Sequence, residues 1–203
     1  MEAENSKYVA NLTKGSLKVA ESRVIAELLL KGMSAAEVQA LAIKDNLLQK
    51  RSPEATRTLA SHLAWRFVGA PECLLTLIVV GSNREATQAC LACLVNRSAL
   101  LAHYLKDSVL EVRNQRRNHL APADWAKYLE ILEDRDSSIR AWTSPVRAKL
   151  RQNIWRILAE AEIVDSTKFL RLQNVRLEDS VKNCLSGSSR SSILEVLALG
   201  GME

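Results

Sequence analysis

Apolar side chains recur every three or four residues along most of the chain, and residues that commonly begin or end helices punctuate this pattern. Gly32 follows one apolar stretch, where a helix would end, and Ser34 and Ser82 each stand three residues before a glutamate, as in a capping box. Ser52 precedes a proline, which suits a helix start. The pattern predicts helices at residues 16–31, 34–49, 52–69, 82–97, 99–118, from 122 onward, 144–162 and 177–185, with apolar segments at 71–81 and 193–199.

The pattern changes near Thr143. After the helix at 144–162 come two short stretches with β-branched and aromatic residues, 163–164 and 168–172, separated by a polar turn. A helix followed by a short two-strand ribbon is how a winged-helix module ends. We therefore predict a mainly α fold, in which residues 1–140 form a multi-helix bundle and residues 141–203 a winged-helix-like module. The two parts could also pack as one continuous globule.

No stretch of the sequence is apolar for long enough to cross a bilayer. A spanning helix needs roughly 20 apolar residues, whereas the longest apolar run covers only residues 73–80. Residues 1–7 lack the basic-then-apolar order of a secretory signal. We therefore expect a cytoplasmic protein that has no membrane partner and whose four cysteines remain reduced thiols.

Positive charge is concentrated near the C-terminal end. With 47% hydrophobic and 25% charged residues, the chain has the composition of a folded domain and not of a disordered basic tail. Its formal net charge is +5, which favours a phosphate-bearing partner because cationic side chains release the counterions condensed on nucleic acid. Residues 145–176 hold seven basic and three acidic residues, so most of the excess charge lies there.

The helix at 144–162 has an apolar stripe, which leaves basic and amide side chains on the rest of its surface. Arginine can bridge guanine in the major groove, and glutamine or asparagine can bridge adenine. We therefore predict that this helix contacts bases of double-stranded DNA. The candidate residues are Arg147, Lys149, Arg151, Gln152 and Asn153. The alternative is a solvated helix face that only keeps the protein soluble.

Two other basic groups are candidates for phosphate contacts. Arg113, Arg116 and Arg117 lie near the end of the helix at 99–118, and Lys168 and Arg171 lie in the predicted ribbon. Cations near a helix C-terminus also complement the helix dipole, so the first group has a purely structural explanation as well.

Motifs for catalysis or metal binding are missing from the sequence. It contains no phosphate-binding loop, dinucleotide-binding fingerprint, nucleophile elbow or zinc-protease helix motif. Cys90 and Cys93 form a C-x-x-C pair, but no second cysteine pair or close histidine pair completes a zinc site. We therefore expect a non-enzymatic protein with no metal and no cofactor, and we place this pair in the core. Acid–base catalysis by residues far apart in the sequence stays open as an alternative.

Two regions of the chain carry a family resemblance. One contains TKGSL at 13–17, ESRVIAE at 21–27 and DNLLQKRS at 45–52, and the other contains VRAKL at 146–150 and ILAEA at 157–161. These segments resemble the BrxA family of bacteriophage exclusion (BREX) systems, and no family motif is matched beyond Ala161. The resemblance implies a small, mainly helical accessory protein of an anti-phage operon, similar to antitermination-factor and winged-helix folds, that has no catalytic residues and binds DNA.

The helix face, the charge and the resemblance together predict a DNA-binding accessory protein of phage defence. Two alternatives stay open. The basic faces could hold other BREX proteins in a scaffold, or the chain could bind RNA through an antitermination-like arrangement of helices.

Overall fold

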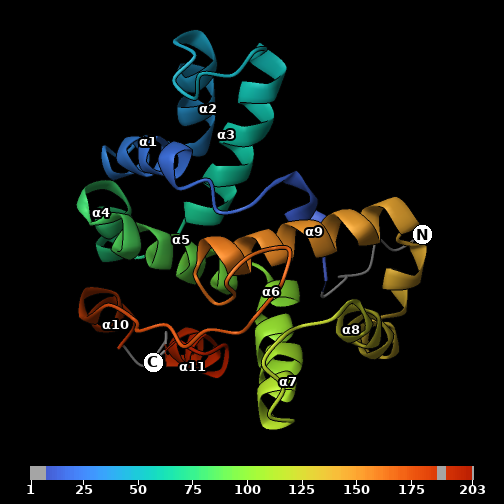
Figure 1. The fold of residues 1–203 in the computed structure, drawn as a ribbon. Helices are drawn as coiled ribbons and strands as arrows, with labels where there is room; N and C mark the ends of the chain where they lie inside the picture. Colours follow the sequence, from blue (N-terminus) through green and yellow to red (C-terminus); the bar gives the residue numbers. More distant parts are fainter. Residues whose placement is uncertain (1–7, 187–190, 203) are drawn as a thin grey trace. The chain divides into compact units, whose positions relative to one another are not determined.

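A computed structural model describes residues 8–186 and 191–202, and nearly all of their regular structure is helical (Figure 1). Residues 1–7, from which we predicted the absence of a secretory signal, lie outside this range. The helical elements, with 3₁₀ and π turns labelled η, are η1 (Ala10–Lys14), α1 (Val19–Leu30), α2 (Ala35–Lys44), α3 (Pro53–Phe67), α4 (Glu72–Val80), α5 (Asn83–Arg97), α6 (Ala99–His103), η2 (Tyr104–Val109), α7 (Leu110–Asn114), α8 (Pro122–Arg135), η3 (Ser137–Ala141), α9 (Ser144–Glu160), α10 (Asp179–Leu185) and α11 (Ser191–Leu199). The prediction of a mainly α fold is confirmed.

Capping residues begin the helices where the sequence predicted. At α2, the Ser34 hydroxyl accepts the backbone N–H of Glu37 at 3.3 Å, and the Glu37 carboxylate accepts the backbone N–H of Ser34 at 2.8 Å. Ser82 and Glu85 form the same reciprocal pair at α5, at 3.2 and 2.8 Å. Each pair satisfies two N–H groups that the first turn of a helix leaves without a partner.

The helix predicted at 99–118 is divided into three pieces. Between α6 and α7 the chain makes one widened turn, the π-helical η2, and α7 ends at Asn114. Arg116 then takes a left-handed backbone conformation with φ of 57°, which ends the helix earlier than the sequence indicated. Arg116 and Arg117 therefore lie after the helix and not within its last turn.

The chain divides into two compact units. One contains the described residues among 1–16, 95–177 and 189–203, and the other contains residues 17–94 and the described part of 178–188. Helix α5 begins in the second of these units and ends in the first. The boundary that we predicted near residue 140 falls inside the first unit, so α9 packs in the same unit as α6, α7 and α8.

In the unit that contains residues 17–94, one arginine joins α1 to the end of α4. The guanidinium of Arg23 donates to the carbonyls of Ile78 at 2.9 Å, Val79 at 2.7 Å and Gly81 at 2.9 Å. These carbonyls have no N–H partner further along the helix, and a cation also complements the negative end of the helix dipole. Arg23 therefore caps α4 from a neighbouring helix.

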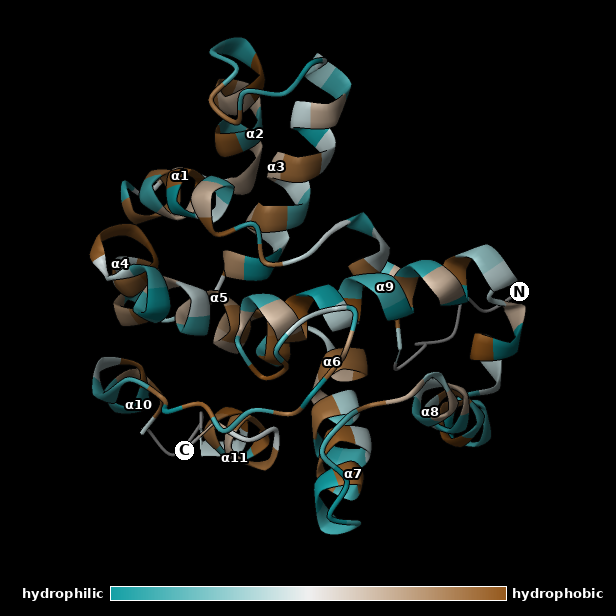
Figure 2. Cartoon of the chain, in the orientation of Figure 1, coloured by the Kyte–Doolittle hydropathy of each residue, from teal (hydrophilic) through white to brown (hydrophobic). Residues whose placement is uncertain are grey.

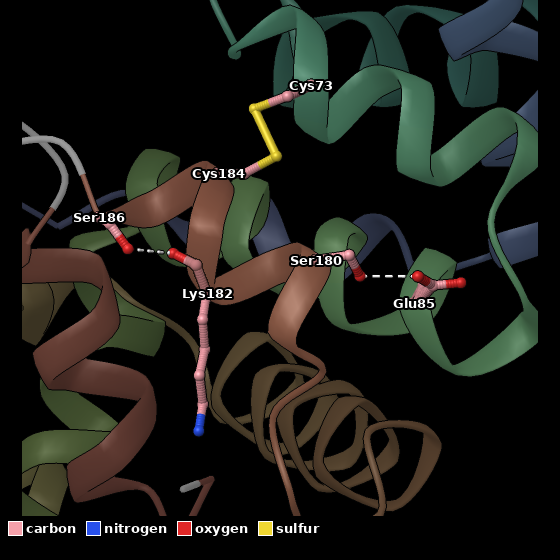
Figure 3. Close-up of a disulfide and its surroundings, with 6 residues drawn as sticks. All are labelled: Cys73, Glu85, Ser180, Lys182, Cys184 and Ser186. Carbon is pink, nitrogen blue, oxygen red and sulfur yellow. Dashed lines mark hydrogen bonds between the residues drawn. A yellow bond between two sulfur atoms is a disulfide. The ribbon is translucent and has the colours of Figure 1, made fainter.

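A disulfide in the same unit joins Cys73 on α4 to Cys184 on α10 (Figure 3). Their Cα atoms are 5.9 Å apart although 111 residues separate them in the sequence. The Ser180 hydroxyl donates to the Glu85 carboxylate at 2.6 Å beside it, which fastens α10 to α5 as well. The expectation that all four cysteines are thiols is therefore wrong for this pair, because no local pattern shows that two such distant residues meet.

Cys90 and Cys93 are buried on α5 and belong to no disulfide, as their apolar surroundings predicted. Burial away from water is the main cause that raises the pKa of the Cys93 thiol, so this side chain stays protonated at neutral pH.

In the unit that contains α6 to α9, an aromatic cluster forms part of the core. The rings of Tyr104, Trp125 and Tyr128 lie with their centroids 5.1 to 5.7 Å apart. Helix α9 packs one side into this unit, and the apolar stripe predicted from the sequence is confirmed at Leu150, Ile154, Ile157 and Leu158. Figure 2 shows the matching alternation of hydrophobic and hydrophilic positions along α9.

The predicted ribbon after α9 consists only of isolated bridges. Val164 pairs with Leu172 in antiparallel fashion, and His119 pairs with Arg171. Residues 170–172 therefore lie between residues 163–165 on one side and residues 118–120 on the other, joined by backbone hydrogen bonds of 2.8 to 3.0 Å. Because no longer strand forms in the described residues, the β-ribbon of a winged helix stays a prediction.

Within the two described stretches, 8–186 and 191–202, no helix combines the length and the apolar character that crossing a bilayer requires. The apolar segment predicted at 71–81 forms α4, which is nine residues long.

Candidate nucleic-acid interface

An open groove of about 660 Å³ runs along the exposed side of α9. Its walls come from the first four turns of the helix and from Thr167 in the following loop. The polar and aromatic residues that line it are Lys149, Arg151, Gln152, Trp155, Arg156 and Thr167. Three of these side chains carry positive charge and none carries negative charge, so the groove suits an anionic ligand.

Trp155 gives the groove an aromatic wall with a fixed orientation. Its indole N–H donates to the hydroxyl of Tyr104 at 3.1 Å, which anchors the ring to the buried aromatic cluster. The guanidinium carbon of Arg151 lies 5.1 Å from the centre of the Trp155 ring, within the range of a cation–π contact. The cation and the ring therefore form one continuous surface.

Lys149 and Gln152 lie one turn apart on the exposed side of α9. The Lys149 ammonium donates to the Gln152 side-chain oxygen at 3.1 Å. Both side chains are exposed, as is Arg156 one turn further along. Arg156 is four residues from Gln152 and seven from Lys149, so it belongs to the same helical row. The helical period could have placed Arg156 among the candidates, which did not include it.

A loop at residues 165–171 borders the groove and carries two of the predicted phosphate contacts. Lys168 and Arg171 are exposed and flank the ring of Phe169, with the Lys168 ammonium at 5.0 Å and the Arg171 guanidinium at 5.3 Å from the ring centre. Arg171 also takes part in the bridge to His119 through its backbone. Sequence reasoning did not include Phe169 among the candidate contacts, because it read this aromatic residue only as part of the predicted ribbon.

The Arg147 side chain is engaged in contacts within the protein. Its guanidinium lies 2.6 Å from a carboxylate oxygen of Glu133, and it donates to the carbonyls of Trp142 at 2.9 Å and Ile139 at 3.2 Å. These contacts attach the start of α9 to α8 and η3. Arg147 therefore positions the helix that carries the groove and is absent from the groove's walls.

Asn153 lies in the core, contrary to the expectation of an exposed side chain. Only 3% of its surface is exposed, and its amide donates to the carbonyl of Leu12 at 2.7 Å. Asn153 therefore ties η1 to α9 and faces away from solvent.

The basic residues of the 113–117 segment contact other parts of the same unit. Arg113 donates to the carbonyl of Gln173 at 2.6 Å and to the side chain of Asn174 at 2.9 Å. Arg117 donates to both oxygens of Asp124 at 2.7 and 2.8 Å. Arg116 is exposed beside them.

Asp124 both pairs with Arg117 and caps α8. Its carboxylate accepts the backbone N–H of Ala121 at 2.7 Å. Partial burial raises the pKa of Asp124, but the hydrogen bonds from Arg117 and from the Ala121 backbone outweigh this effect and lower the pKa below its usual value.

Replacing Asp124 with Asn should lower the free energy of unfolding at pH 7 by about 1 to 2 kcal/mol, because the ion pair and part of the cap are removed. A carboxyl whose pKa is lower in the folded than in the unfolded protein stabilises the fold at any pH above its unfolded-state pKa. This stabilisation is lost as the pH falls through its folded-state pKa. The gap between wild type and D124N should therefore close below about pH 4. Urea unfolding at several pH values measures this difference in stability.

The control is Asp134→Asn, at an exposed position of the same helix, which should change stability by less than about 0.5 kcal/mol. Equal stability of D124N and D134N at pH 7 would contradict the role assigned to Asp124.

In the described residues, no group of three or more His, Cys, Asp or Glu side chains is placed to hold a metal ion.

A family model described as BrxA matches residues 6–189 of the chain. Two curated relatives each carry the name BREX protein BrxA. The relative from Paramagnetospirillum magneticum is 30% identical over 191 residues, which cover 94% of this chain and 96% of that protein. The relative from Escherichia coli is 27% identical over 190 residues, which cover 94% of this chain and 89% of that protein.

A solved structure has the same fold over almost the whole chain. It is a crystal structure of an uncharacterized protein from Magnetospirillum magneticum, with a TM-score of 0.85 and 29% identity, covering 94% of this chain and 97% of that one. The family match also includes residues 162–176, where no family motif was recognised in the sequence. The groove and the loop beside it therefore lie within the matched region, and the chain belongs to the BrxA family.

Proposed function

We propose that this chain binds double-stranded DNA as an accessory protein of a BREX anti-phage defence system, and that it contributes binding rather than catalysis. The observation that carries the proposal is the groove on α9, where Lys149, Arg151 and Arg156 gather around an amide and an indole. Phosphate oxygens are the ligands that such clustered cations prefer, and Gln152 adds a side chain that can read a base edge.

The order of elements around the groove supports a winged-helix interpretation of this unit. Residues 118–120 precede α8, and η3 connects α8 to α9. Residues 163–165 and 170–172 then follow and form the two sides of the loop at 165–171. In helix-turn-helix proteins the second helix of the pair enters the major groove. By that analogy α9 is the recognition helix, and the loop is a wing that lies on the adjacent backbone.

Five exposed or half-buried cations are available to this footprint. Three lie on α9, and Lys168 and Arg171 lie in the loop. We leave Arg147, Asn153, Arg113 and Arg117 out of the direct contacts, since each bonds to another segment of the fold. Lys149 and Arg156 instead pair with Gln152 and Glu160 on α9 itself. Arg116 could add a phosphate contact at the edge.

Fluorescence anisotropy with a labelled mixed-sequence duplex tests the proposal. Affinity should fall as salt rises from roughly 50 to 200 mM, with a slope of log K against log salt of about −3 to −5 for three to five phosphates neutralised. Unlabelled duplex should compete better than single-stranded RNA of the same length. Stronger competition by RNA would favour the RNA-binding alternative, and no binding at the lowest salt would favour a scaffold for other BREX proteins.

A further inference from the structure

Phe169 is an exposed aromatic side chain in an otherwise basic loop. It exposes 53% of its surface, and it is the only aromatic among the large hydrophobic residues that are exposed in the described parts of the chain. Lys168 and Arg171 lie on either side of it in the sequence, with their charged groups 5.0 and 5.3 Å from the ring centre. Contacts of this kind are weak where water is present, so they do not account for an apolar ring at this position.

The loop holds Phe169 outward by several hydrogen bonds. The Ser166 hydroxyl accepts the backbone N–H of Phe169 at 3.1 Å, and the Ser166 carbonyl accepts that of Leu170 at 3.0 Å. Asp165 closes the loop by accepting the backbone N–H of Arg171 at 2.9 Å. These hydrogen bonds fix the backbone of the loop, so Phe169 is already exposed in the absence of a ligand.

Leu170, next to Phe169, is buried while the Phe169 ring is exposed. The φ of Leu170 is 54°, a left-handed conformation that residues with a side chain rarely adopt. Leu170 is 4% exposed, and its carbonyl accepts the backbone N–H of Leu120 at 3.0 Å. The chain thus accepts an unfavourable backbone conformation that buries Leu170 and leaves its neighbour in solvent.

We propose that Phe169 is a wedge that enters between two base pairs from the minor groove and bends the duplex. This inference rests on the proposed function, since it requires α9 in the major groove and the loop on the neighbouring backbone. Apolar side chains, phenylalanine among them, unstack a base step in this way when phosphate contacts hold the protein on both sides. Lys168 and Arg171 supply those contacts, and their release from the ring on binding exposes its faces to the bases.

The wedge also gives the protein a preference that base contacts alone do not. Flexible steps such as TA and CA unstack at low cost, so a wedge favours DNA that contains them at the point of insertion. The protein should therefore bind a duplex with a TA step, or with a mismatch, more tightly than an A-tract of equal length.

The test measures bending and binding separately. A duplex of about 30 base pairs carries a donor at one end and an acceptor at the other, and saturating wild-type protein should raise energy transfer by shortening the end-to-end distance. Phe169→Ala should lower affinity roughly tenfold and abolish the rise, because the ring no longer stacks on a base while the phosphate contacts remain. Phe169→Trp should keep the bend, and Val80→Ala, at another exposed apolar position, should behave as wild type.

The outcomes separate this inference from the proposed function. If F169A bends saturated duplex as much as wild type does, or if wild type binds without any rise in energy transfer, the wedge is wrong while DNA binding stands. If anisotropy shows no binding to duplex by the wild-type protein, the proposed function fails and the wedge fails with it. Thermal unfolding of each variant, expected within about 2 °C of wild type for an exposed side chain, shows that the fold is intact.

Discussion

Reversing the charge of both Lys149 and Arg156 should lower the affinity of the protein for duplex DNA about a hundredfold at roughly 100 mM salt. Each substitution removes one cation from the groove on α9 and places a carboxylate near a phosphate, so attraction is replaced by repulsion. The slope of log K against log salt should become shallower by about two, one for each phosphate that the variant no longer neutralises. Anisotropy titrations of K149E/R156E and wild type, each at several salt concentrations, give both quantities.

A matched control separates local contacts from net charge. Lys44→Glu with Arg51→Glu changes the net charge by the same amount at two exposed positions in the other unit. This pair should reduce affinity less than about fivefold, because neither residue lines the groove and a charge outside the contacts acts mainly through a screened long-range field. If both double variants reduce affinity equally, the interface is not the groove on α9.

Local signals in the sequence were sufficient for most of the helical fold. Capping boxes involve residues three apart, so the starts of α2 and α5 could be predicted at Ser34 and Ser82. The break within 99–118 could not be predicted in the same way. A π turn adds a single residue to one turn, and the apolar residues on either side, Leu101 and Val112, still face the core.

The candidate site was predictable only as a helix face. Helical periodicity placed Lys149 and Gln152 on the exposed side of α9, where they lie. The same periodicity also argued against Asn153, which is three residues after Leu150 and four before Ile157 on the buried stripe. The amide group of Asn153 suggested base contacts, but its helical position decides where the side chain points, and the expectation of an exposed side chain was wrong.

The local sequence does not show which basic side chains form ion pairs or hydrogen bonds within the protein. Arg147 pairs with Glu133, which belongs to another helix, and Arg113 bonds to the backbone of Gln173 sixty residues away. The sequence shows that such residues are basic but not that a carboxylate or carbonyl meets them in the fold. A positive net charge over 145–176 therefore indicates a basic region but does not show which of its cations are engaged within the protein.

The Cys73–Cys184 disulfide could not be predicted from the sequence, and removing it should strongly lower the stability of the protein. It closes a loop of 111 residues, and a cross-link of that length removes conformational entropy from the unfolded chain equivalent to about 4 to 5 kcal/mol in the loop-closure model, with about 2 to 4 typical of measured cases. Cys184→Ser should therefore lower the melting temperature by roughly 10 °C for a chain of this size.

Reducing agent should lower the melting temperature of the wild type to that of C184S and leave C184S itself unchanged. Cys90→Ala provides the control, because Cys90 is buried and belongs to no disulfide. This variant should be destabilised by a cavity of one sulfur atom yet still respond to reductant. Alkylation of the unfolded, unreduced wild type should modify two cysteines. If all four cysteines are modified and reductant does not change the melting temperature, the disulfide is absent.

The position of the bond determines which part of the protein should respond first when it is cut. Helix α10 has only seven residues, too few to be stable without tertiary contacts. Reduction leaves intact the hydrogen bonds from Ser180 to Glu85 and from the Glu178 backbone to Gln88. The bond from Ser180 is also the main cause that lowers the pKa of Glu85. Hydrogen exchange in C184S should therefore rise most at α10, while the amides of α9 should keep their protection because that helix is buried through contacts in the other unit.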